Sequence, residues 1–450
     1  MPTMRPLADL ARDLDAGRTT SVDLVEQALA RIADPAGEGG RAFMTVHAEA
    51  ARAAAAASDR LRAVGLVPSA LAGIPVSVKD LLDERGFVTR AGSTARSDAP
   101  AAAADAPVVA RLRAAGAVIV GRTNMTEFAF SGVGINPHYG TPAAPYERAT
   151  RRRIPGGSSS GAAVSVTDGM AAVGIGSDTG GSVRIPSAFC GLAGFKPTAH
   201  RVPTTGAFPL STTLDSLGPL APTVACCALV DAIMAGEEPA VPDAAPLAGL
   251  RLGLPRNMVR DGIEPVVADV FDAALAKLSA AGARIVEFAF AELDEIPRIN
   301  AKGGFAVAEA YAIHRTLMAA KGDMFDPRVL TRIARGEGMS AADYIDLVGA
   351  RADLNRRADA RTAAFDAVVM PTCVVLPPPI ADFADDVFFS RTNMLILRNT
   401  SLGNFLDRCS LSIPCTPAGA PPVGFCLVGA RDDDRRLLAI GRAVEAALAA

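Results

Sequence analysis

Two glycine loops that carry serine are the residues of this chain best suited to covalent chemistry. One loop is GGSSSG at Gly156–Gly161 and the other is DTGGS at Asp178–Ser182. Glycine lets the backbone approach a ligand closely and turn several N–H groups toward one point. Such a cluster of N–H donors stabilises an oxyanion, and a serine beside it can serve as the nucleophile. The two loops therefore predict acyl transfer.

The base that such a serine needs is predicted to be a lysine. None of the four histidines lies in or between the two loops; they are His47, His138, His200 and His314. Upstream, the apolar segment GIPVSV at Gly73–Val78 is typical of a buried strand, and it ends at Lys79. Burial disfavours the charged form of a lysine and lowers its pKa. Lys79 can therefore act as a base.

Further motifs accompany these residues along most of the chain. They are GIPVSVKD at Gly73–Asp80, GRTNMTEFAFSG at Gly121–Gly132, PGGSSSG at Pro155–Gly161, SDTGGSVRIPSAFCGLAGFKPT at Ser177–Thr198, LDSLGPLA at Leu214–Ala221 and VMPT at Val369–Thr372. Together they resemble the amidase signature family of serine hydrolases. The block Gly156–Pro186 is the most specific part of this resemblance.

The resemblance implies a Ser-cisSer-Lys catalytic set. By motif, Lys79 is the base, Ser158 is the bridging serine after a cis peptide at Gly157–Ser158, and Ser182 is the nucleophile. We expect Lys79 Nζ, Ser158 Oγ and Ser182 Oγ to form one hydrogen-bonded chain at an edge of the sheet. The oxyanion hole is expected to use the N–H groups of Thr179, Gly180, Gly181 and Ser182. No metal ion or organic cofactor is implied.

The neighbours of these residues are expected to support the loops. Ser159 and Ser160 are predicted to hold their loop by hydrogen bonds, although one of them could touch the site. Asp80 follows Lys79 on an extended strand, so its side chain is expected to point the other way and to make a structural contact. Asp178 and Arg184 could pair to fix the second loop, or Arg184 could hold a substrate carboxylate.

Candidate residues for the substrate pocket lie in two segments. They are Met125, Phe128, Phe130, His138, Tyr311 and His314. Each could instead belong to the core, which is the commoner place for an aromatic residue on a helix. The segment AVAEAYAIHR at Ala306–Arg315 resembles the one with which allophanate hydrolases hold a carboxylate. Ala310 stands where an arginine is expected there, which argues against that activity.

Composition excludes several other classes of protein. The chain has 450 residues, half of them apolar, and a net charge of −3. It shows no basic stripe with interleaved aromatics, so direct nucleic-acid binding is not expected, and the run Arg151–Arg153 is interpreted as a solvated loop. No uncharged apolar stretch of membrane-spanning length and no secretory signal are found. Seven cysteines without CxxC spacing predict buried thiols in a cytoplasmic protein.

The pattern of elements predicts an α/β protein. The first 65 residues are predicted to be helical, and from Gly73 short apolar strands alternate with helices, which is typical of strands buried on both faces. Residues 236–247 form the one linker-like stretch. The resemblance implies a single amidase domain over residues 1–450, with a mixed β-sheet core covered by helices on both faces. Its parts are N-terminal helices (1–65), a catalytic core (70–235) and a second half (248–450) that completes the same sheet.

Three functions share this sequence pattern. The first is an amidohydrolase that cleaves a small or medium carboxamide. The second is the glutaminase A subunit of a tRNA-dependent amidotransferase, which passes ammonia to a partner protein. The third is a catalytically silent structural role, against which the presence of Lys79, Ser158 and Ser182 argues. The expected partner is a small-molecule amide, no membrane is involved, and a homodimer is left open.

Overall fold

A single mixed sheet organises the computed structural model, which describes residues 4–449; residues 1–3 and 450 of the predicted domain lie outside the described residues. Its strands are β1 (Phe43–Val46), β2 (Pro75–Lys79), β3 (Val118–Thr123), β4 (Val173–Asp178), β5 (Ala193–Lys196), β6 (Ser216–Ala221), β7 (Arg251–Pro255), β8 (Arg284–Phe288), β9 (Ala367–Pro371), β10 (Ser410–Pro414) and β11 (Gly424–Val428). Within the described residues they form one 11-stranded sheet in the order β1-β3-β2-β4-β6-β5-β10-β11-β9-β7-β8. The fold is therefore one α/β domain.

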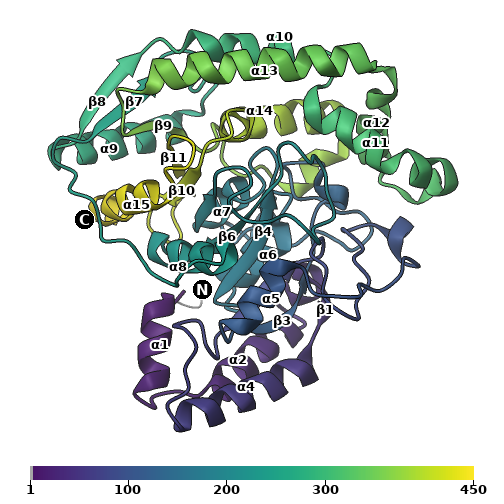
Figure 1. Cartoon of the computed structure of the whole chain (residues 1–450), viewed down its shortest axis with the longest axis vertical. Coiled ribbons are helices and arrows are strands. Elements are labelled where there is room, and N and C mark those ends of the chain that lie inside the picture. The colour runs from purple at the N-terminus through teal and green to yellow at the C-terminus, as the bar shows by residue number, and fades with distance from the viewer. Residues whose placement is uncertain (1–3, 450) are drawn as a thin grey trace.

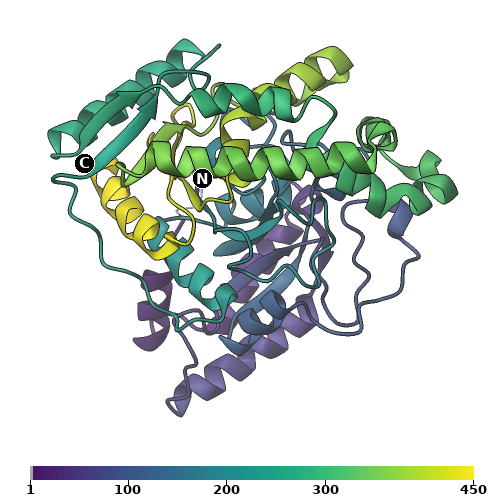
Figure 2. The ribbon, with the colours of Figure 1, turned by 45° about the horizontal axis from the view of Figure 1, so that its top comes forward.

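Helices cover both faces of this sheet. They are α1 (Leu7–Asp15), α2 (Ser21–Ala33), α3 (Gly39–Ala42), α4 (Ala48–Ala63), α5 (Pro107–Ala114), α6 (Ser160–Thr167), α7 (Arg184–Cys190), α8 (Val224–Ala235), α9 (Pro265–Ala280), α10 (Ile296–Ile299), α11 (Gly304–Lys321), α12 (Pro327–Ala334), α13 (Ala341–Thr362), α14 (Asp386–Phe405) and α15 (Asp434–Ala449). Helices α8 and α15 pack on one face, and α6 and α7 pack on the other (Figure 1). The long α13 crosses in front of the sheet when the molecule is tilted (Figure 2).

The pairing of β2 with β4 brings the segment that ends at Lys79 and the loop that carries Ser182 to the same end of the sheet. These strands are parallel neighbours, with Val78 opposite Ile175. Their carboxyl ends therefore lie side by side, and Lys79 and Asp178 are the last residues of the two strands. Helix α6 begins at Ser160 and leads back to the start of β4, so the serine loop before it lies at the same edge. The predicted meeting of both loops at one end of the sheet is confirmed.

Alternation along β2 decides which way Lys79 points. Val76 and Val78 belong to the main core, whereas Ser77 hydrogen-bonds Ser165 of α6, with 2.8 Å between the hydroxyl oxygens. Because side chains two apart on a strand share a face, Lys79 lies on the α6 side with Ser77. The start of α6 carries the serine run, so the strand aims the lysine at those hydroxyls.

The exposure of the linker and the burial of the cysteines largely agree with the predictions made from the sequence. Residues 237–250 run along the surface from α8 to β7 and include a mostly exposed stretch (Figure 1). All seven cysteines are free, and six are buried, whereas Cys415 is only half-buried. Within residues 4–449, no helix combines the length and the hydropathy that crossing a bilayer requires.

Candidate active site

Lys79 is the centre of a cluster of serine hydroxyls. Its side chain is fully buried, and Nζ donates to Ser158 Oγ at 2.7 Å, Ser177 Oγ at 2.9 Å and Ser159 Oγ at 3.0 Å. No carboxylate is within ion-pair distance of Lys79 in the described residues. Asp80 instead accepts from Arg122 Nε at 2.9 Å, which is the structural contact expected for it.

This environment prepares Lys79 to act as a base. Burial lowers the pKa of Lys79 to about 7, although the charges of Asp178 and Asp215 act to raise it. An ordinary lysine is almost wholly protonated at neutral pH, whereas a lysine with a pKa near 7 is neutral about half of the time. Neutral Nζ has a lone pair that can accept the proton of a serine hydroxyl.

Ser158 lies on the loop that leads into α6. The peptide bond between Gly157 and Ser158 is cis, as the resemblance implies. The Gly157 N–H donates to Gly132 O at 2.8 Å, and the Ser158 carbonyl accepts the Thr126 N–H at 3.1 Å. These backbone bonds tie the loop to the segment that follows β3. Ser158 Oγ is thereby held against Lys79 Nζ.

Ser182 is adjacent to this loop, but the predicted hydrogen-bonded chain is only partly formed. Lys79 Nζ reaches Ser158 Oγ, whereas in residues 4–449 no hydrogen bond joins Ser158 Oγ to Ser182 Oγ. The two loops meet through the Ser159 N–H, which donates to Ser182 O at 3.3 Å. Catalytic hydrogen bonds are often long before substrate binds, and the role of Ser182 as the nucleophile stays a prediction.

Asp178 shapes the loop that carries Ser182. Its carboxylate accepts the Gly181 N–H at 2.7 Å and the Val183 N–H at 3.1 Å, and it is paired with Arg184 through Nε at 3.0 Å and Nη2 at 2.9 Å. Burial acts to raise the pKa of Asp178, but the charge and hydrogen bonds of Arg184, with help from Lys196 and Asn404, together outweigh it and hold that pKa at about 2. Of the two roles considered for Arg184, the structure shows the pairing.

This arrangement changes the expected set of oxyanion donors. The Gly181 N–H is directed at Asp178 and is not free to meet a substrate oxygen. Within the described residues, the N–H groups of Thr179, Gly180 and Ser182 donate to no protein acceptor. Unpaired N–H groups are rare in buried backbone and are what an oxyanion hole requires. The sequence could not separate Gly181 from its neighbours because the difference lies in one side-chain acceptor.

Helix α14 supplies contacts that no sequence motif indicated. Asn404 Nδ2 donates to Asp178 O and to Asp178 Oδ1, both at 2.9 Å, and Asn404 Oδ1 accepts from Arg184 at 2.7 Å. One helix turn earlier, Thr400 Oγ1 donates to Gly180 O at 2.7 Å. The second half of the chain therefore holds the Ser182 loop through α14.

The serine run divides into two roles. Ser159 donates its hydroxyl to Ser177 O at 3.3 Å and also accepts from Lys79, so it both holds the loop and touches the base. Ser160 reaches only Asn124 O, at 3.5 Å. Ser177, on β4, is a third partner of Lys79 that was not predicted from the sequence. Its signal was its place in the SDTGGS motif.

The six residues proposed for a substrate pocket differ in their burial and in their partners. Met125, Phe128 and His314 are buried in the core, where the Phe128 and His314 rings lie 4.2 Å apart between centroids. Arg332 covers the ring of Phe130 at 4.5 Å. The other two lie nearer the surface: His138 bonds Glu127 at 3.0 Å, and Tyr311 is half-buried on α11. Their contact with substrate stays a prediction.

Two other features that could have a role beside these residues are the arginine run Arg151–Arg153 and the candidate metal ligands. Arg152 pairs with Glu38 and Arg153 with Glu147, whereas Arg151 is exposed. Across residues 4–449, no group of three or more His, Cys, Asp or Glu side chains is arranged to hold a metal ion.

Comparisons with known proteins identify the family of this chain. The Amidase family model matches residues 23–438. The 2-amino-5-chloromuconic acid deaminase of Comamonas testosteroni is 38% identical over 412 residues, covering 90% of this chain and 88% of that protein. The A subunit of the Glutamyl-tRNA(Gln) amidotransferase of Roseiflexus sp. (strain RS-1) is 34% identical, covering 98% and 95%. A crystal structure of an amidase superimposes with a TM-score of 0.86 at 31% identity, covering 98% and 99%. The chain therefore belongs to the amidase signature family of amide-cleaving hydrolases.

Proposed function

We propose that this enzyme hydrolyses a small or medium carboxamide through an acyl-enzyme on Ser182. The observation that supports it most is the buried Lys79, whose Nζ lies among three serine hydroxyls with a pKa of about 7. A lysine in this state can exchange a proton with a hydroxyl near neutral pH. Ser158, 2.7 Å away, is the hydroxyl that passes the proton on.

The proposed reaction has two halves. In the first, neutral Lys79 takes the Ser158 proton while Ser158 takes the Ser182 proton, and Ser182 Oγ bonds to the amide carbon. The oxyanion accepts hydrogen bonds from the backbone N–H groups of Thr179, Gly180 and Ser182. The proton then returns through Ser158 to the leaving nitrogen, the C–N bond breaks, and an ester to Ser182 remains. In the second half, water attacks this ester through the same relay and releases the acid.

A direct experiment tests this proposal. Purified enzyme is mixed with a panel of carboxamides, 2-amino-5-chloromuconic acid and glutamine, and ammonia release is followed. The proposal expects turnover of at least one carboxamide, with a mass shift on the Ser182 peptide when the reaction is quenched early. Ammonia release that Ser182→Ala does not affect would refute the acyl-enzyme.

A second function is supported by the similarity to amidotransferase A subunits, which extends over nearly the whole chain. In this alternative the chain is a glutaminase that passes ammonia to a partner protein. Glutamine turnover that rises when a co-purifying partner is added would favour it. Turnover of other amides by the isolated chain would favour the free-standing enzyme.

Assembly and location complete the proposal. We expect a homodimer or monomer in the cytoplasm, where thiols stay reduced, because all seven cysteines are free. Light scattering of the purified chain, with and without reductant, reports its mass. A disulfide-linked product in cells would contradict the expected location.

A further inference from the structure

We propose that Asp215 is a positioning residue of this site, which fixes the oxyanion loop through Thr179 and whose negative charge acts on the Lys79 base. This inference rests on the proposed function. Asp215 directly precedes β6, and its carboxylate accepts three hydrogen bonds. Oδ1 accepts from Thr179 Oγ1 at 2.5 Å, and Oδ2 accepts the N–H groups of Leu210 and Ser211 at 2.9 and 3.1 Å.

The contact with Thr179 places Asp215 next to the reaction. Thr179 is one of the residues whose N–H is free to meet an oxyanion, and its side chain is held only by Asp215 among the side-chain hydrogen bonds of the described residues. A hydrogen bond to a charged group is shorter and stronger than a neutral one. Asp215 thereby fixes the orientation of the peptide that begins the oxyanion loop.

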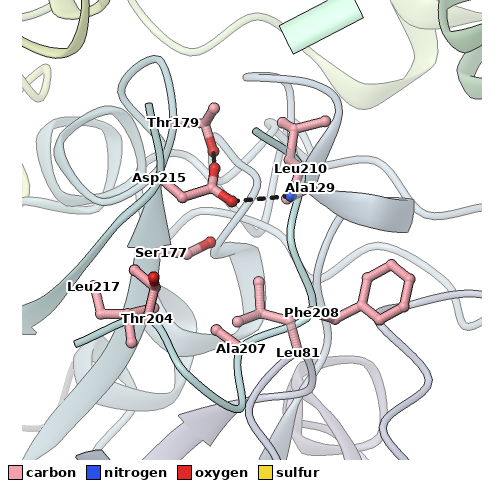
Figure 3. A pocket seen from close by; sticks show the side chains of 10 residues that line it. All are labelled: Leu81, Ala129, Ser177, Thr179, Thr204, Ala207, Phe208, Leu210, Asp215 and Leu217. Atoms are coloured by element: carbon pink, nitrogen blue, oxygen red, sulfur yellow. Dashed lines mark hydrogen bonds between the residues drawn. The ribbon is translucent and has the colours of Figure 1, made fainter. Parts of the chain in front are cut away.

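A small cavity lies between Asp215 and the partners of Lys79. Its volume is about 10 Å³, which is the room needed for about one water molecule. Figure 3 shows Ser177, Thr179 and Asp215 on one side of this cavity, with Leu81 and Ala207 below them. Ser177 Oγ also accepts the hydrogen bond of Lys79 Nζ. The Asp215 carboxylate therefore lines the same buried cavity as a hydroxyl that is bonded to the base, and a charge acts strongly in such a buried space.

The charges around this cavity determine in which direction Asp215 changes the pKa of Lys79. The pKa of Asp215 is raised to about 6: burial raises it most and the Glu309 charge of α11 adds to this, against the hydrogen bonds from Thr179 and the backbone. Asp215 is thus mostly ionised at neutral pH. Its charge and that of Asp178 favour protonated Lys79 and oppose the effect of burial on the lysine pKa. Removing the Asp215 charge should let the Lys79 pKa fall below its present value of about 7.

The pH profile of kcat/KM tests this directly, on whichever substrate the carboxamide panel identifies. In Asp215→Asn, the acidic limb should move to lower pH by about half a unit or more, since one pH unit is about 1.4 kcal/mol of interaction with the proton. The plateau of kcat/KM should fall about tenfold. The reason is that the side-chain amide of asparagine carries an N–H group where a carboxylate oxygen had accepted a hydrogen bond, so one donor loses its acceptor. In Thr179→Val, the charge remains while the loop contact is lost, so the plateau should fall with the limb in place.

Asp231→Asn is the matched control. Asp231 is also a buried carboxylate, but it lies on α8 and pairs with Arg201 at 2.9 Å. Its variant should lose stability and keep the wild-type profile. If Asp215→Asn does not fold, Asp215→Ser keeps one acceptor for the backbone and makes the same test.

The outcomes separate this inference from the function on which it rests. A lower plateau with an unmoved limb in the Asp215 variants would give Asp215 a structural role only and overturn the charge effect. A wild-type plateau in Thr179→Val would overturn the loop contact. Failure of the wild type to turn over any carboxamide would instead refute the proposed function.

Discussion

At the scale of single residues, the site depends on keeping one lysine uncharged. Lys79 is fully buried and contacts no carboxylate of residues 4–449, so its neutral form is accessible near pH 7. The sequence could single out the two serines because they lie in specific glycine motifs, and the lysine because it ends a short apolar segment. It could not predict that Ser177 shares the lysine, which of Ser159 and Ser160 touches it, or that Asp178 occupies the Gly181 N–H. Those facts depend on side-chain directions that a motif does not record.

Substitutions should rank the three catalytic candidates. Ser182→Ala should abolish turnover because no nearby group replaces the nucleophile. Lys79→Ala should be nearly as severe, and Ser158→Ala should lower kcat by about 10²–10⁴-fold, since a water can bridge to Lys79. The double variant of Lys79 and Ser158 should be little worse than Lys79→Ala because the two act as one unit. Steady-state kcat measures this; multiplicative losses would show independent action.

The buried lysine should also leave a mark on stability. Its pKa is about 7 in the folded protein, whereas the ordinary value for an exposed lysine is 10.5, so between these values the unfolded chain binds more protons and stability rises with pH. Lys79→Met lacks this contribution. The free energy of unfolding of the wild type relative to Lys79→Met should therefore increase by up to about 1.4 kcal/mol per pH unit above pH 7.

Urea unfolding of both proteins over that pH range gives the comparison. The absolute difference at one pH also contains the hydrogen bonds that Lys79 makes to serines, so the pH slope is the informative quantity. A slope of zero would mean that Lys79 stays protonated in the folded enzyme.

At the scale of elements, α14 and the Ser182 loop act as one unit. Thr400 and Asn404 lie one turn apart on α14 and contact Gly180 and Asp178. The sequence predicts β2, β3, β4 and α6 from their apolar patterns, but it gives little sign of β6 or α14. The strand β6 reads SLGPLA, whose Gly and Pro are typical of a turn. Buried positions of α14 include Thr392, Asn393, Asn399 and Asn404, so it has no apolar stripe.

Two asparagines of α14 allow a matched test of this unit. Asn404→Ala should lower kcat about tenfold or more by freeing the Asp178 peptide, and it should cost about 1–3 kcal/mol of stability. Asn399 is equally buried, and its Nδ2 donates to Val259 O and Pro371 O, each at 2.8 Å. Asn399→Ala should cost similar stability with less effect on kcat.

Kinetics and urea unfolding of the two variants show whether Asn404 acts through its contact with the Ser182 loop or only through the stability of the fold. Equal losses of kcat at equal losses of stability would show that α14 has no particular hold on the oxyanion loop.

At the scale of the whole molecule, the sheet joins the two halves of the chain. Strand β5 from the first half pairs with β10 from the second, with Leu411 opposite Phe195. The linker that connects the halves is mostly exposed near Glu237 and Glu238. The predicted single mixed sheet is confirmed, and we propose that the segments 1–65, 70–235 and 248–450 fold as one unit around it. The order of its strands, which depends on long-range pairing, could not be read from local patterns.

A protease site inserted after Glu238 tests this unity. Cleavage there should leave the halves associated and the activity near that of the uncut enzyme, because an exposed loop tolerates a nick. Gel filtration and ammonia release before and after cleavage are the measurements. Separation of the halves without denaturant would contradict a shared sheet.

The central claim is that Lys79 activates Ser182, and the pH dependence of Ser182 acylation tests it most directly. A fluorophosphonate reagent is added to wild type and Lys79→Ala, and the labelled peptide is identified by mass spectrometry at each pH. The account predicts labelling of Ser182 at a rate that rises with pH around a midpoint near 7, and a large loss of that rate in Lys79→Ala. Labelling of a different residue, or the same midpoint and rate without Lys79, would contradict it.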